Sequence, residues 1–216
     1  FQPIPTLVSG STYTLSFWYR GGSGAANFTA ILGSAFKPSV PNKLFFSTPG
    51  APNASIEILP AFPALWLNEV EPENVSGLTD SAGEHDPWVE LYNAGNSVVE
   101  LEGYWLSDNY TQLDQWAFPA GAKIDPGQFL LIWADGQPGP GPEWHTSFRL
   151  AKSSGSIALS RAVNGQPQVV DYLNYTGLAP DQSYGDFPDG QPFTRQPFYI
   201  STPGAANNGT GVPAKV

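Results

Sequence analysis

The sequence predicts an all-β fold in which strands pack as a sandwich. Short apolar runs recur along the chain, and clusters of Gly, Pro, Asn and Asp separate them, as is typical of sandwiches. The 23 Gly and 22 Pro in 216 residues are too many for a helical bundle and follow no collagen period. No window keeps a helical period over several turns.

The first expected strand lies near the N-terminus. Between Ser11 and Arg20, large apolar side chains alternate with Thr and Ser, which places them on opposite faces of a strand. The apolar face consists of Tyr13, Leu15, Phe17 and Tyr19. Further strands are expected at residues 28–32, 65–70, 88–92, 104–106, 129–134, 156–160 and 169–173.

A domain boundary is expected near residue 60. Residues 1–60 carry a net charge of +2 and the remainder carries −12, and the change falls at the Pro-rich stretch 59–63. Residues 44–53 also resemble residues 198–207, and each segment runs an apolar strand into a Pro-Gly turn. We therefore expect a strand block at 1–60 that is incomplete or exchanges strands, a sandwich at 61–208 and a tail at 209–216.

Composition excludes several classes of function. A net charge of −10 argues against nucleic acid, because that affinity depends on Lys and Arg. The chain has no Cys and no apolar run of the roughly 18 residues that span a membrane. It also has no Met, so we expect that its start at Phe1 arose by cleavage, such as signal removal, by excision, or by loss of a leader.

Seven short motifs occur in a characteristic order between residues 65 and 208. They are Trp-Leu-Asn-Glu-Val at 66–70, Trp-Val-Glu-Leu-Tyr-Asn at 88–93, Leu-Glu-Gly-Tyr-Trp-Leu-Ser-Asp at 101–108, Phe-Pro-Ala-Gly at 118–121, Pro-Gly-Gln-Phe-Leu-Leu-Ile-Trp-Ala at 126–134, Phe-Arg-Leu at 148–150 and Thr-Pro-Gly-Ala-Ala-Asn at 202–207. In this order they resemble the lamin tail domain family, in the form found in exported bacterial proteins. The resemblance implies an immunoglobulin-like β-sandwich and a scaffold or adhesion role without catalysis.

Catalytic signatures are missing from the sequence itself. His85 and His145 are the two imidazoles, and Glu84-His85-Asp86 lies in a polar loop rather than in a recognisable catalytic motif. No Gly-x-Ser-x-Gly elbow, Walker or dinucleotide pattern occurs. We therefore expect that the protein is not an enzyme and holds no cofactor.

Calcium is the metal that the sequence brings into consideration. It takes six to eight oxygen ligands, and acidic residues in turn-like stretches supply them. The candidates are Asp80, Glu84 and Asp86, with Asp108, Asp181, Asp186 and Asp189 in similar stretches. The alternative is that these carboxylates simply keep an acidic surface soluble.

Two further kinds of surface site are expected. The N-glycosylation pattern Asn-x-Ser/Thr occurs at Asn27, Asn53, Asn74, Asn109, Asn174 and Asn208. These matches are either glycan acceptors or a consequence of Asn, Ser and Thr gathering in turns. Exposed aromatic rings bind sugars, for which Trp18, Trp105, Trp116 and Trp144 are candidates, although most Trp in a sandwich build its core.

The N-terminal block points to assembly. Its few strands carry a strongly apolar face that they cannot bury alone, and open strand edges invite pairing. The preceding segment is extended by prolines and carries Ile4, Leu7 and Val8 as anchors for strand addition to a neighbouring subunit. Repeated head to tail, such a contact gives a fibre.

We therefore expect a non-enzymatic structural protein, located outside a bacterial cell or on its surface, that forms a homopolymer or joins other surface proteins and carries glycans. The alternative is a carbohydrate- or cell-surface-binding module of a larger secreted protein. No nucleic-acid partner and no membrane span are expected.

Overall fold

The computed structural model describes residues 60–209, and these residues belong to one compact unit. The strands expected at 11–20 and 28–32 lie outside the described residues, so their prediction stays open. The described part contains β-strands and turns but no helix, and therefore no helix able to cross a membrane. The strands are β1 (Leu65–Glu71), β2 (Trp88–Asn93), β3 (Val99–Glu100), β4 (Tyr104–Ser107), β5 (Trp116–Ala117), β6 (Lys123–Ile124), β7 (Phe129–Trp133), β8 (Gly155–Val163), β9 (Gln166–Tyr175), β10 (Ser183–Gly185) and β11 (Gln196–Phe198).

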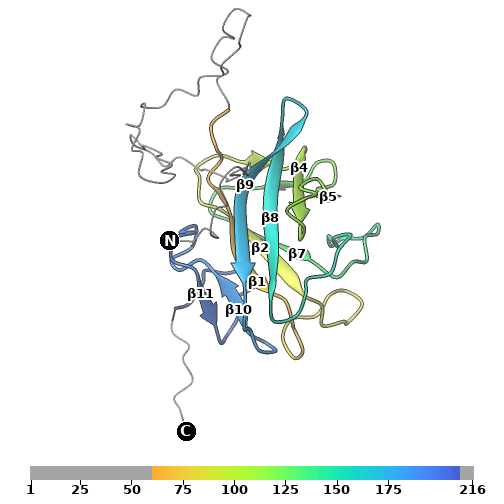
Figure 1. Ribbon diagram of the computed structural model, residues 1–216, viewed down its shortest axis with the longest axis vertical. Helices are drawn as coiled ribbons and strands as arrows, with labels where there is room; N and C mark the ends of the chain where they lie inside the picture. The colour runs from red at the N-terminus through yellow and green to blue at the C-terminus, as the bar shows by residue number, and fades with distance from the viewer. Residues whose placement is uncertain (1–59, 210–216) are drawn as a thin grey trace, which may run out of the picture. The chain divides into compact units, whose positions relative to one another are not determined.

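Two antiparallel sheets form the sandwich. One has the order β11-β10-β1-β2-β7 and the other the order β5-β4-β8-β9, while β3 and β6 make a small separate ladder. Figure 1 shows the long β8–β9 hairpin lying across the strands β1, β2 and β7 of the other sheet. This arrangement confirms the predicted all-β, immunoglobulin-like sandwich.

The hydrophobic core lies between the two sheets because the strands alternate. On β2, Val89 and Leu91 are fully buried within the core, whereas Trp88 and Glu90 belong to the opposite face of the sheet. A bulge between Leu67 and Glu69 interrupts the pairing of β1 with β2. The opposite sheet contributes apolar side chains from β4, β8 and β9 to the same core.

The β8–β9 hairpin is the longest paired element of the domain. Its turn consists of Asn164 and Gly165, whose φ angles of 52° and 73° lie in the left-handed region. Two successive positive φ angles match the twist of a two-residue hairpin, and Asn-Gly is the pair that adopts them most readily. The turn thereby lets the two strands pair over nearly their whole length.

Candidate metal centre

A tight loop between β1 and β2 brings three carboxylates together. One ligand oxygen each from Asp80, Glu84 and Asp86 lies within 4.8 Å of the others. Oδ1 of Asp80 accepts hydrogen bonds from the backbone N–H groups of Ala82 at 3.0 Å and Glu84 at 2.8 Å. Gly83 has a φ of 82°, which a glycine adopts without strain, so the chain can turn tightly here. The structure thus places the three predicted calcium candidates side by side.

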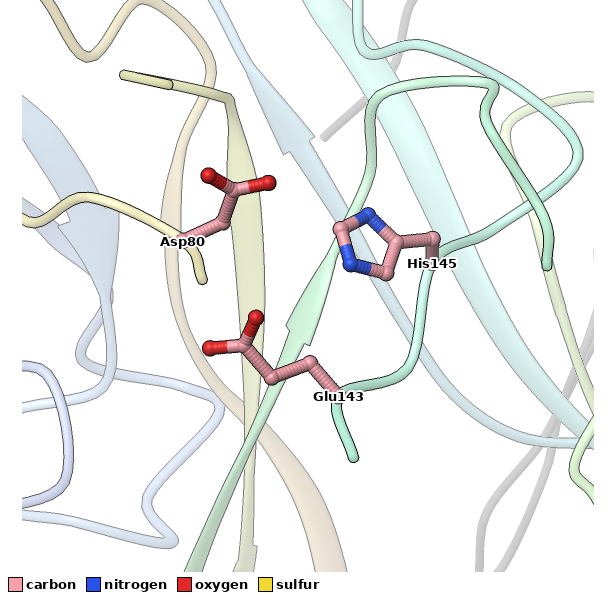
Figure 2. A group of neighbouring side chains, drawn as sticks. All are labelled: Asp80, Glu143 and His145. Carbon is pink, nitrogen blue, oxygen red and sulfur yellow. The ribbon is translucent and has the colours of Figure 1, made fainter. Parts of the chain in front are cut away.

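A second group shares Asp80 with the first. Asp80, Glu143 and His145 also offer ligand atoms within 4.8 Å of one another, and Figure 2 shows the two carboxylates facing the imidazole. Glu143 and His145 come from the segment between β7 and β8. Members of both groups line a pocket of about 270 Å³. The pocket therefore joins segments that are more than fifty residues apart in the sequence.

Hydrogen bonds fix the side chains of the second group. The carboxylate of Glu143 accepts the N–H of Ser81 at 2.7 Å, and hydrogen bonds from Ser81 lower the pKa of Glu143. Nδ1 of His145 lies 2.6 Å from Oδ2 of Asp135, whose side chain is buried. Because Asp135 occupies Nδ1, the other ring nitrogen of His145, Nε2, is the one that points toward Asp80 and Glu143 (Figure 2).

Asp86 is the most buried carboxylate of the first group. Only 4% of its surface is exposed. Oδ1 of Asp86 pairs with Nη1 of Arg149 at 2.8 Å, whereas its Oδ2 is buried without a hydrogen-bond partner. A buried oxygen of this kind costs free energy unless a cation or donor meets it. The loop therefore has the chemistry of a cation site.

A second set of acidic side chains is buried on the outer face of the five-stranded sheet. Glu69 on β1 lies directly opposite Glu90 on β2, and both are fully buried. The carboxylate of Glu69 accepts hydrogen bonds from Thr202 and Ser183, and Glu90 accepts them from Gly204 and Asn68. Burial raises the pKa of Glu69 to about 7 and the pKa of Glu90 to about 8. These carboxylates fasten the C-terminal segment to the sheet.

Arg195 joins two more buried carboxylates. Its Nε donates to Asp186 at 2.7 Å and its Nη2 donates to Asp171 at 2.7 Å. Burial raises the pKa of Asp186 to about 7, and the Arg195 charge opposes that rise. Oδ2 of Asp171 also accepts the backbone N–H of Leu67 at 2.9 Å. Arg195 therefore links β9, β1 and the segment after β10.

The glycosylation candidates differ in their exposure. Asn27 and Asn53 lie outside the described residues. Asn74 is buried, and its Nδ2 donates to the carbonyl oxygens of Leu78 and Asp86, so in the folded domain it has no amide free for a glycan. This geometry argues against a glycan on Asn74 of the folded domain. The sequons at Asn109, Asn174 and Asn208 are exposed and stay predictions.

The predicted strand-pairing, sugar-binding and calcium residues also fall partly outside and partly inside the described residues. Ile4, Leu7, Val8, Tyr13, Leu15, Phe17, Tyr19 and Trp18 lie outside the described residues. Trp116 and Trp144 are partly buried and pack against the core, and Trp105 is also half-buried. Of the remaining acidic candidates, Asp181 binds the N–H groups of Val75 and Ser76, while Asp186 pairs with Arg195.

Sequence reasoning missed Glu143, the His145–Asp135 contact and the buried Glu69–Glu90 pair. Nothing in the spacing of Asp135, Glu143 and His145 forms a known motif, and their approach to Asp80 depends on the loops after β1 and β7. The Glu69–Glu90 pair did leave a signal. Both residues lie between large apolar residues of their strands, which indicates a covered face with its own polar partners.

Comparison with known proteins agrees with the fold. The family model described as Lamin Tail Domain, a non-catalytic immunoglobulin-like family, matches residues 61–177. No curated protein matches the chain. Strands β10 and β11 and the segment that covers Glu69 and Glu90 lie beyond the matched residues. Even so, β10 pairs with β1, β11 pairs with β10, and the segment bonds to Glu69 on β1 and Glu90 on β2.

Proposed function

We propose that this chain, which belongs to the lamin tail domain family, is a non-catalytic structural subunit of an extracellular or cell-surface assembly. Copies join by β-strand addition, in which the N-terminal segment of one copy pairs with a sheet of the next. Glycans on the exposed sequons Asn109, Asn174 and Asn208 belong to the same proposal.

The observation that carries this proposal is that both large sheets of the sandwich have edge strands. Within the described residues neither large sheet closes into a barrel: one ends at β11 and β7, the other at β5 and β9. Strand addition requires such a sheet margin, because the incoming segment bonds through its backbone. The alternating apolar residues Tyr13, Leu15, Phe17 and Tyr19 are, in this proposal, the side chains that a neighbouring copy covers.

The buried acidic network supports a structural role over catalysis. Glu69, Glu90 and Asp186 are carboxyl groups with strongly raised pKa values, a property common in active sites. Here each of them is fully buried and holds segments of the same domain together. Burial within the domain accounts for their raised pKa values.

The alternative of a sugar-binding module has weaker support. Stacking on a sugar requires a flat ring open to solvent, whereas Trp116 and Trp144 pack against the core. The exposed rings of residues 60–209 are Tyr and Phe, with Phe193 the most exposed, and none of them is a Trp candidate.

Size-exclusion chromatography with light scattering tests assembly. We expect the full chain to form concentration-dependent polymers that dissociate when residues 1–8 are removed, because these residues carry Ile4, Leu7 and Val8. Removal of residues 210–216 is the matched control and leaves the polymers intact. A full-length chain that stays monomeric at high concentration contradicts the proposal.

A further inference from the structure

We infer that the loop at residues 80–86 is a calcium site whose protein ligands are Asp80, Glu84 and Asp86. Two oxygens bound to the same Ca²⁺ at roughly 2.3–2.6 Å each lie at most about 5 Å apart. The three ligand atoms, all within 4.8 Å of one another, satisfy this limit. One ion can therefore contact all three carboxylates without a large movement of the loop.

The unpartnered oxygen of Asp86 is independent support for an ion. Asp86 is 4% exposed and its Oδ2 has no hydrogen-bond partner, although the same carboxylate belongs to the ligand group. Arg149 pairs only with Oδ1. The carboxylate is ion-paired through Oδ1, and coordination of Oδ2 by a cation would remove the remaining cost of burying an oxygen without a hydrogen-bond partner.

The loop is already organised for binding. Oδ1 of Asp80 holds the N–H groups of Ala82 and Glu84, which leaves its other oxygen for the ion. Glu143 holds the N–H of Ser81 from across the pocket. A loop fixed before binding loses less conformational entropy when the ion arrives.

Calcium fits this group better than a transition metal does. All three ligands are carboxylate oxygens, which hard cations such as Ca²⁺ prefer. The neighbouring group of Asp80, Glu143 and His145 has the donor set of a zinc site, with Asp135 orienting the imidazole. However, the buried oxygen that lacks a partner belongs to the loop group, so the loop group gains most from an ion.

Calorimetric titration of the metal-free full chain with CaCl₂ tests the inference. We expect saturable binding with a Kd in the range of extracellular calcium modules, about 10⁻⁴–10⁻³ M, and a higher melting temperature with Ca²⁺. E84Q and D86N should each weaken binding about tenfold or more because each removes a charged ligand. Glu84 is exposed, so E84Q keeps the test valid even if D86N fails to fold.

Two matched variants complete the experiment. E102Q removes an exposed carboxylate on the turn before β4 and should leave Ca²⁺ affinity unchanged. H145Q should change Ca²⁺ affinity less than about threefold, because His145 is outside the loop group. Absence of Ca²⁺ binding at about 10 mM overturns the inference. So does preferential Zn²⁺ binding that H145Q abolishes and E84Q leaves intact.

Discussion

Glu69 and Glu90 occupy directly opposed positions on β1 and β2, where two like charges normally destabilise a sheet. The pair is tolerated for two reasons. Donors from Ser183, Thr202, Gly204 and Asn68 surround the carboxylates, and burial raises both pKa values so far that the pair is partly protonated near neutral pH. The same residues make the domain sensitive to pH.

Stability should fall as the pH rises toward about 8. A carboxyl group whose pKa is higher in the folded than in the unfolded state stabilises the fold while it is protonated. Its contribution to the free energy of unfolding is at its full value below the unfolded-state pKa. That stability is lost as the pH passes through the folded pKa, which is about 8 for Glu90 and about 7 for Glu69 and Asp186. Between about pH 5 and about pH 8, we expect the free energy of unfolding to fall by roughly 3 kcal/mol or more, since all three groups contribute in the same direction.

Urea unfolding across this pH range measures the effect. E90Q should make the dependence shallower, because an amide does not ionise, while Glu69 and Asp186 preserve part of it. The exposed substitution E102Q should keep the wild-type slope. A stability that rises with pH in the wild type would contradict the assignment.

Arg195 is the residue whose loss should cost most. R195A leaves the buried carboxylates of Asp171 and Asp186 without their cation, and breaking a buried pair typically costs about 3–5 kcal/mol. R195K keeps the positive charge but cannot reproduce the paired guanidinium hydrogen bonds, so it should lower the free energy of unfolding less than R195A does. K152A removes an exposed pair with Glu73 and should cost about 0–1 kcal/mol. Chemical denaturation compares the three, and an R195A value near that of K152A would argue against the network.

At the scale of elements, the approach of β10 to β1 depends on a glycine. A Cβ atom on Gly185 would lie 2.0 Å from the carbonyl oxygen of Asn68 and 2.9 Å from Cα of Glu69. Both are backbone atoms of the paired strand, so they cannot move aside without disturbing the sheet. The short strand β10 is therefore held in place by the absence of a side chain.

G185A should destabilise the domain by about 2 kcal/mol or more, as expected for an overpacked backbone contact. G139A is the matched control: its nearest neighbour would be the Gln137 carbonyl oxygen at 4.0 Å, and the change should stay within about 0.5 kcal/mol. Thermal melts monitored by circular dichroism compare the two. Equal melting temperatures would show that β10 can separate from β1 at little cost.

The strands themselves were largely predictable. The expected runs at 65–70, 88–92, 104–106 and 129–134 correspond to β1, β2, β4 and β7 within one residue at each end. Strands β8 and β9 extend further than predicted because the Asn164–Gly165 turn continues their pairing. The two- and three-residue strands β3, β5, β6, β10 and β11 escaped prediction, since so few residues show no alternation.

At the scale of the whole molecule, the domain closes through its C-terminal segment. Thr202 and Gly204 bond to Glu69 and Glu90, and Asn207 donates to the carbonyl oxygens of Asn68 and Asp186. These contacts cover polar groups on β1 and β2 that would otherwise lose their donors. The folded domain therefore extends past the residues that match the family model.

Truncation separates the contribution of this closing segment, residues 201–209, from that of residues 210–216. A chain that ends at Ile200 should melt at a clearly lower temperature, because Glu69 and Glu90 lose donors that typically contribute about 1.5–3 kcal/mol each to charged groups. A chain that ends at Gly209 should melt like the full chain. If both truncated chains melt alike, the closing segment contributes no stability.

The sequence by itself determined the all-β class, the main strands and, through ordered motifs, the family. It also identified Asp80, Glu84 and Asp86 as candidate ligands on one loop. These features are local, because alternation and turn residues act over a few neighbouring positions. Only the tertiary structure decided that Glu143 and His145 join this loop, that Arg195 meets Asp171 and Asp186, and that Asn74 is buried. The physical reason is that a strand pattern shows which face is covered, whereas packing selects the distant segment that covers it.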